Sequence, residues 1–239
     1  MVDALDLCPS AQLGRPSSNL GTGTIYREKE APLFDHLATV DSQASLLALD
    51  EDRTTVQDFL LVLDATNSLT EKMLTKRAKR AVASTLNVRG IRVLFEALWE
   101  SPRRRGDALI ANKYASGSPW SALARTRLDD TTTERSLVLE HVVPMKNMLS
   151  IIRHMGERGM SIEERLEAIH GLVRHMVITR EDDMHLPSTM SSDQEDTLLD
   201  HYTKVNPLDE TTLREARWIR YLSTPQGTEI LNSARPLNS

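Results

Sequence analysis

The chain is poor in cysteine and in aromatic residues, and each shortage excludes a class of protein. Cys8 is the only cysteine among 239 residues, which excludes a framework of internal disulfides and a zinc site built from several cysteines. Aromatic residues make up only 4% of the chain, so a core must consist mainly of Leu, Val, Ile, Met and Ala. The hydrophobic share of 40% is sufficient for such a core, and the composition is not that of a disordered chain.

Long apolar runs and glycine-rich phosphate loops are also missing. No run approaches the roughly 20 apolar residues that a membrane-spanning helix needs. The N-terminal residues include Asp3 and Asp6 and lack the apolar stretch of a secretory signal. Gly21 and Gly23 are not followed by a third glycine at the spacing of a dinucleotide-binding loop. We therefore expect a cytoplasmic protein that does not associate with a membrane.

Charge is distributed unevenly, although the net charge of −5 argues against a protein that is basic throughout. Residues 71–127 hold 13 Lys and Arg against 4 Asp and Glu, a local balance of +9. Such a segment can neutralise phosphates and release counterions, which gives sequence-independent affinity for nucleic acids. The alternative is a solvated helix face that pairs with acidic residues elsewhere. The candidate phosphate contacts are Lys76, Arg77, Lys79, Arg80, Arg103, Arg104, Arg105, Arg125 and Arg127.

Apolar periodicity predicts a mainly α-helical protein with a small two-stranded β-hairpin and a helix embedded near residues 136–186. The early part of the chain is rich in Pro, Gly and Ser and indicates an irregular arm. The division that follows is an N-terminal arm at 1–53, a helical basic region at 54–135, a module containing the hairpin at 136–187 and a C-terminal helical region at 188–239.

Local start and stop signals predict the elements of the module. The run from Leu137 to Val143 is typical of a strand, and Pro144 ends it. Capping boxes at Ser161 and Thr179 each indicate the start of a helix. Together these signals predict strands at 137–143 and 176–178, a helix at 145–155, a second helix from 161 and a short helix from 179.

Further signals lie on either side of the module. Pro119 after Ser118 is typical of a helix start, and residues 188–194 resemble a linker. A helix is expected over 212–222, in which the stretch from Trp218 to Tyr221 packs against the rest of the protein. Three basic residues could give that helix a side that faces phosphate, namely Arg214, Arg217 and Arg220.

The pair Glu140-His141 near the end of the first strand carries the most specific chemical signal. Hydrolysis of a phosphodiester needs a divalent metal that stabilises the developing negative charge and a base that activates water. A carboxylate is a ligand for a hard metal ion, and an imidazole is a suitable base because its ordinary pKa lies near neutrality. We expect Glu140 to bind metal and His141 to act as the base.

The acid-His pair followed by Pro144 resembles the opening of the ββα-metal (HNH) nuclease motif. The later stretch from Val177 to Leu186 is similar to the strand-to-helix junction of that family: two apolar residues, Thr, a basic residue, two acids, a metal ligand and Leu. The resemblance covers residues 136–186 and implies a metal-dependent endonuclease that cleaves DNA, in a restriction, phage or defence context. It places the second metal ligand on Asp183.

The resemblance also implies a cofactor and a residue that orients the base. Oxygen ligands from Glu140 and Asp183 favour Mg²⁺, or Mn²⁺, over zinc. The family usually has an Asn that orients the histidine; Asn147 is the only Asn between His141 and Asp183, and we assign it that role.

The sequence leaves a second reading open. Neighbouring residues of a regular strand face opposite sides, so Glu140 and His141 share one site only where the strand twists, bulges or ends. His141 alone is also typical of a half-buried strand histidine with a hydrogen-bond partner. The alternative is a non-catalytic helical protein, of phage or bacterial origin, that binds nucleic acid or another protein. A nuclease fold kept as a binding scaffold and a homodimer also stay open.

Overall fold

The structure is a computed structural model that describes residues 27–45, 51–73, 75, 108–110, 114–129 and 136–237. The chain divides after Ala31 into two units, and every element that positions the candidate site belongs to the second unit, residues 32–239. Helices dominate the described residues, and two small antiparallel sheets accompany them. The expectation of a mainly α-helical protein is therefore confirmed.

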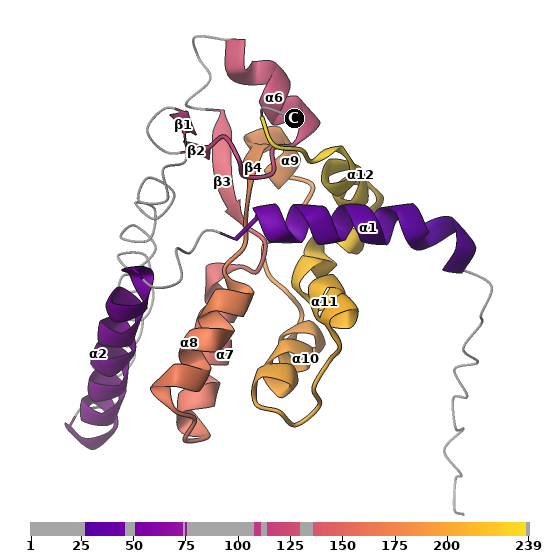
Figure 1. Cartoon of the computed structure of the whole chain (residues 1–239). Coiled ribbons are helices and arrows are strands. Elements are labelled where there is room, and N and C mark those ends of the chain that lie inside the picture. The colour runs from indigo at the N-terminus through magenta and orange to yellow at the C-terminus, as the bar shows by residue number, and fades with distance from the viewer. Residues whose placement is uncertain are drawn as a thin grey trace, which may run out of the picture. The chain divides into compact units, whose positions relative to one another are not determined.

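The predicted β-hairpin is present. β3 (Leu137–His141) and β4 (His175–Thr179) pair in antiparallel fashion and lie side by side (Figure 1). The register places Leu139 opposite Val177 and Glu140 opposite Met176. β-branched and aliphatic residues favour such a strand, and Pro144 prevents its continuation, as the sequence indicated. Since paired residues of an antiparallel sheet point to the same face, this register decides what each side chain meets.

Two antiparallel helices connect the strands. α7 (Met145–Glu157) follows Pro144, and α8 (Ile162–Leu172) begins at the predicted capping box of Ser161 and Glu164. Gly159 between them has a φ of 75°, a left-handed conformation that glycine adopts without a steric penalty. The helices leave the hairpin from one end (Figure 1), and their apolar faces pack against α2 (Glu51–Met73) in the largest core.

After β4 the chain continues as a series of helices, some of which pack against the hairpin. α9 (Arg180–Asp183) is a single turn that starts at the predicted capping box of Thr179 and Asp182. It is followed by α10 (Ser192–Tyr202), α11 (Glu210–Leu222) and α12 (Pro225–Ser233). Ser191 caps α10, so the predicted linker at 188–194 ends earlier than expected. The predicted helix at 212–222 is confirmed within α11.

The N-terminal half differs from the expectation in several places. α1 (Arg27–Gln43) is a helix within the segment interpreted as an irregular arm. A second sheet, β1 (Leu109–Ile110) with β2 (Tyr114–Ala115), lies in the region expected to be helical. Pro119 does not start a helix: α6 (Ala122–Thr126) begins after Ser121, and a 3₁₀ turn, η2 (Arg127–Asp129), follows it. Pro119 instead accepts a hydrogen bond from the Val177 amide of β4, at 2.9 Å.

The two faces of the hairpin pack into different cores. Val138, Met176 and Ile178 contact a cluster that includes Trp218 and Tyr221 of α11. The opposite face, with Leu137, Leu139 and Val177, packs against a smaller cluster around Tyr114 and Trp120. Strand alternation therefore directs Glu140 toward α11, because Glu140 pairs with Met176.

A buried acid, Asp41, attaches α1 to the rest of the second unit. Its carboxylate accepts hydrogen bonds from Arg217 Nη2 and Trp218 Nε1, both at 2.7 Å, and lies 3.3 Å from Arg174 Nε. Arg217 is only 3% exposed, so this helix side does not face a phosphate. The expected packing of Trp218 and Tyr221 is confirmed by their ring contact, with centroids 5.3 Å apart.

Candidate metal and catalytic site

Glu140 is mostly buried and forms an ion pair with α11. Arg220 donates from Nη1 to Glu140 Oε1 at 2.5 Å. The same guanidinium donates to the carbonyl oxygens of His141, at 3.0 Å, and Pro187, at 2.5 Å. Arg220 is 3% exposed and Glu140 13%, so the pair is shielded from solvent. It joins the end of β3, α11 and the segment after α9 in one place.

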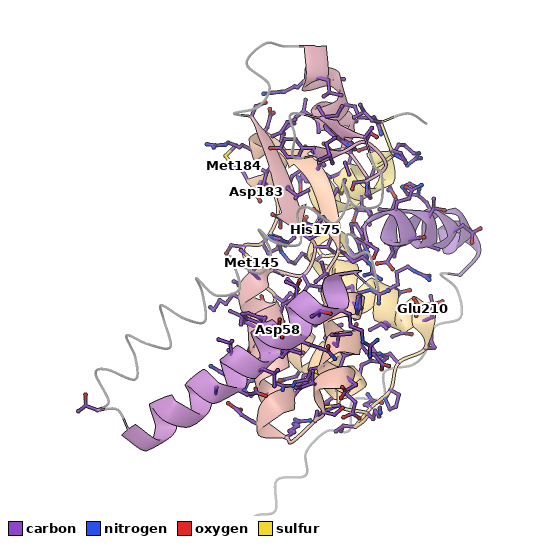
Figure 2. The ribbon with its side chains drawn as sticks, turned by 60° about the vertical axis from the view of Figure 1, so that its left-hand side comes forward. Asp58, Met145, His175, Asp183, Met184 and Glu210 are labelled. Carbon is purple, nitrogen blue, oxygen red and sulfur yellow. The ribbon has the colours of Figure 1, made fainter. Side chains whose placement is uncertain are left out.

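Asp183 is the last residue of α9, which packs against β3. It is half-buried at the end of α9, next to the exposed Met184; Figure 2 labels both. Burial raises the pKa of Glu140, Arg220 opposes that effect, and the negative charge of Asp183 raises the pKa further. A charge shifts the pKa of another group only when the two are close in space, so the charge of Asp183 is felt at the Glu140 carboxylate. Asp183 thus influences the Glu140 carboxylate electrostatically, and a shared metal ion stays a prediction.

His141 points to the other face of the hairpin. Its ring contacts the ring of His175, the residue paired with it, with centroids 4.4 Å apart. β3 is regular through His141, so the strand does not bring the imidazole and the Glu140 carboxylate to one face. Burial, and secondarily the charge of Arg220, lowers the pKa of His141 to about 4. The imidazole is therefore neutral at pH 7, which is the state a general base requires.

Asn147 makes contacts that do not support its assigned role. It is buried at the start of α7, and its amide donates to Glu195 Oε2 at 2.5 Å. Its carbonyl oxygen accepts from the Met190 amide at 3.1 Å. These bonds attach α7 to α10 and to the chain before it. Orientation of His141 by Asn147 stays a prediction, and the hydrogen bonds of the amide point to a structural role.

Most of the proposed phosphate contacts lie outside the described residues, and two can be placed. Arg125 is half-buried in α6 and donates to the carbonyl oxygens of Trp120, at 3.2 Å, and Ser233, at 3.0 Å. Arg127 is 41% exposed and forms a 2.9 Å ion pair with Glu181. Arg125 thus holds backbone groups, while Arg127 remains at the surface. The proposed phosphate contacts that lie outside the described residues are Lys76, Arg77, Lys79, Arg80, Arg103, Arg104 and Arg105.

The carboxylates near Glu140 do not form a complete set of protein ligands for a divalent ion. Within the described part of the chain, no group of three or more His, Cys, Asp and Glu residues is arranged to hold a metal. Two carboxylates, from Glu140 and Asp183, fit Mg²⁺, which is commonly held by one or two carboxylates and keeps several of its waters. Arg220 already donates to one oxygen of Glu140, and binding of Mg²⁺ or Mn²⁺ by Glu140 and Asp183 stays a prediction.

Comparison of the chain with family models, with curated proteins and with solved structures gives no match. Among the described residues, no helix combines the length and the apolar character needed to cross a membrane. The functional argument therefore depends on the geometry of the hairpin and its neighbours.

The sequence did not predict that α11 supplies a buried partner for Glu140. Arg220 was named as a residue that could face phosphate, whereas it is buried against Glu140, 80 positions earlier in the chain. Tyr221 was interpreted only as a packing residue. The available signal for Tyr221 was its position three residues after Trp218, on the same face of an amphipathic helix; no local signal indicated the burial of Arg220.

The buried histidine pair predicts that acid destabilises the protein. His175 is fully buried, and burial, followed by the charges of His141 and Arg174, lowers its pKa well below 6.5. The unfolded chain therefore binds more protons below pH 6.5, so stability is complete above that pH and is lost as the pH falls. We expect a loss of about 1.4 kcal/mol per pH unit from this group.

Urea unfolding at pH 7.5, 6.0 and 5.0 measures this effect. His175→Gln keeps a neutral polar side chain and should reduce the slope relative to the wild type. His154→Gln, at a histidine that is 40% exposed, is the matched control and should leave the slope unchanged. A slope that is the same in the wild type and in His175→Gln would contradict the prediction.

Proposed function

We propose that the protein is a metal-dependent nuclease of HNH type that hydrolyses DNA phosphodiester bonds. The observations that support the proposal are the order β3, β4 and then α9, which follows the motif, and the charge of Asp183, which acts on the buried Glu140 carboxylate. The elements between the strands are longer than in compact members of the family, because α7 and α8 fill the connection. The proposal keeps a cytoplasmic location.

Each residue of the proposed site has a distinct task. Glu140 and Asp183 hold Mg²⁺ or Mn²⁺, which stabilises negative charge on the phosphate and the leaving oxygen when bound. His141, neutral at pH 7, accepts the proton of the attacking water. Arg220 fixes the Glu140 carboxylate through a buried charge-assisted hydrogen bond. The basic segment supplies backbone affinity for DNA.

Incubation with supercoiled plasmid, with and without Mg²⁺ or Mn²⁺, tests the proposal. We expect nicked and linear products that depend on the metal and are abolished by EDTA. A parallel reaction with single-stranded and structured RNA determines the preferred nucleic acid. Intact plasmid at every metal concentration, or cleavage that persists in EDTA, would contradict the metal-dependent mechanism.

The Glu140–Arg220 ion pair favours a second candidate function. A buried carboxylate that already has a guanidinium partner can be purely structural, and then Asp183 need not share an ion with it. The hairpin would then be a scaffold in a non-catalytic protein that binds nucleic acid or another protein. Plasmid binding in a gel-shift assay without cleavage and without Mn²⁺ affinity would favour this candidate.

A further inference from the structure

A cavity of about 270 Å³ lies where α6, α9 and α12 meet, and Figure 1 labels all three helices. Sites for drug-sized ligands begin at about 300 Å³, so this cavity suits a smaller molecule. One face of α12 forms a wall of the cavity, because its four lining residues are three or four positions apart. These four residues are Gln226, Glu229, Ile230 and Ser233.

Asp182 of α9 offers one free carboxylate oxygen to this cavity. The residue lines the cavity although it is only 7% exposed. Its Oδ2 accepts hydrogen bonds from the Ser121 hydroxyl, at 2.7 Å, and from the Thr179 amide, at 3.0 Å. Its Oδ1 accepts none from a described residue and is not sealed from solvent. The bonds to Oδ2 fix the carboxylate, so Oδ1 is held in place for a ligand that donates a hydrogen bond.

The charges of the lining favour a cation. Two lining residues are acids, Asp182 and Glu229, and none is Lys or Arg. His185 and Gln226 add side chains that accept hydrogen bonds. Since no three His, Cys, Asp or Glu side chains of the described residues are arranged to hold a metal, Asp182, His185 and Glu229 do not converge on one ion. Separate positive charges therefore match this cavity better than a single metal ion does.

We propose that the cavity binds a small aliphatic diamine, with one ammonium group on Asp182 Oδ1 and the other at Glu229. An ammonium group is a compact charge with three hydrogen-bond donors. Leu123 and Ile230 supply apolar lining for the carbon chain. A lysine side chain of another protein offers the same group but only one charge, so the two sources can be separated. The inference goes beyond the proposed function and does not depend on it.

Calorimetric titration of the full chain with diaminobutane tests the inference. Butanediol is the neutral analogue, and butylamine is the analogue with one charge, which also represents a lysine side chain. We expect the diamine to bind most tightly, butylamine more weakly and the diol not at all. Asp182→Asn retains an oxygen for Ser121 and Thr179 and replaces the free oxygen with an amide nitrogen. It should raise the dissociation constant of the diamine by about 10- to 100-fold, the usual contribution of a hydrogen bond to a charged group.

A second variant tests the other end of the ligand without touching a capping residue. Glu229 is exposed on α12, so Glu229→Gln leaves the fold intact. It should raise the dissociation constant by about 2- to 5-fold, as expected of an exposed ion pair. Glu167→Gln is the matched control, because Glu167 is an exposed acid on α8 outside the cavity. It should bind the diamine as the wild type does.

Several results would overturn the inference, and all of them leave the proposed function standing. One is the absence of diamine binding by the wild type, and another is equal affinity of the wild type and both cavity variants. Binding of butanediol as tightly as the diamine would show that charge plays no part. Equal affinity for butylamine and the diamine would remove the second ammonium site and favour a lysine side chain. Mn²⁺ binding that Asp182→Asn abolishes would assign the cavity to a metal ion instead.

Discussion

His141→Ala is expected to lower metal-dependent plasmid cleavage by about 10²- to 10⁴-fold, the usual contribution of a positioned general base. The imidazole is neutral at pH 7 because burial and the charge of Arg220 lower its pKa to about 4. It can therefore accept a proton, although its low basicity argues for an effect toward the lower end of that range. Single-turnover cleavage at saturating protein measures the chemical step directly.

A matched control separates catalysis from folding. His154→Ala changes a half-buried histidine on α7 that forms an ion pair with Glu157, 3.8 Å away. It should cleave at the wild-type rate. Far-UV circular dichroism and urea unfolding establish that His141→Ala remains folded despite losing its contact with the His175 ring. A folded His141→Ala protein that cleaves plasmid at the wild-type rate would exclude His141 as the base.

The mechanism depends most on where the His141 imidazole lies relative to Glu140. β3 is regular, so Glu140 and His141 leave it on opposite faces, and His141 reaches the metal side only from the end of the strand. His141 is the last residue of β3, and Val142 continues toward α7. The Val142 amide still donates to the Arg174 carbonyl at 3.0 Å, and the His141 ring contacts that of His175, so the mechanism requires the imidazole to turn away from this position to reach an ion at Glu140.

Local signals explain why much of the module could be predicted from the sequence. The strand pair follows from β-prone runs with a proline stop, and the helix starts at Ser161 and Thr179 follow from reciprocal capping boxes. These features depend on residues three or four positions apart. Asp183 was assigned by the resemblance to the HNH motif instead, and its role as a ligand stays a prediction.

Long-range contacts explain the errors. Pro119 is typical of a first helical residue, yet the edge of β4 binds its carbonyl and keeps the chain extended for two more residues. The sequence left open that Arg217 and Arg220 could face phosphate, and arginine is rarely buried without a partner. Their partners, Asp41 and Glu140, lie 176 and 80 positions away in the sequence, and no local pattern predicts these pairs.

Arg220→Met is expected to destabilise the protein by about 3–5 kcal/mol, because it leaves a mostly buried carboxylate without its cation. The pair is 13% and 3% exposed, so solvent does not replace the lost partner. The carbonyl oxygens of His141 and Pro187 lose a donor at the same time. Urea unfolding at pH 7.5 measures the effect. Arg214→Met is the control and should cost less, since Arg214 is more exposed and its contacts are longer.

A double variant determines how much of that loss comes from the orphaned charge. Arg220→Met with Glu140→Gln removes both charges, so it should be more stable than Arg220→Met alone. A divalent ion provides a second test, because an ion held by Glu140 and Asp183 supplies the positive charge that Arg220 no longer provides. Saturating Mn²⁺ should therefore stabilise Arg220→Met more than the wild type. Equal stabilisation of the two proteins would show that the ion, wherever it binds, does not contact Glu140, and the proposed chemistry would lose its first ligand.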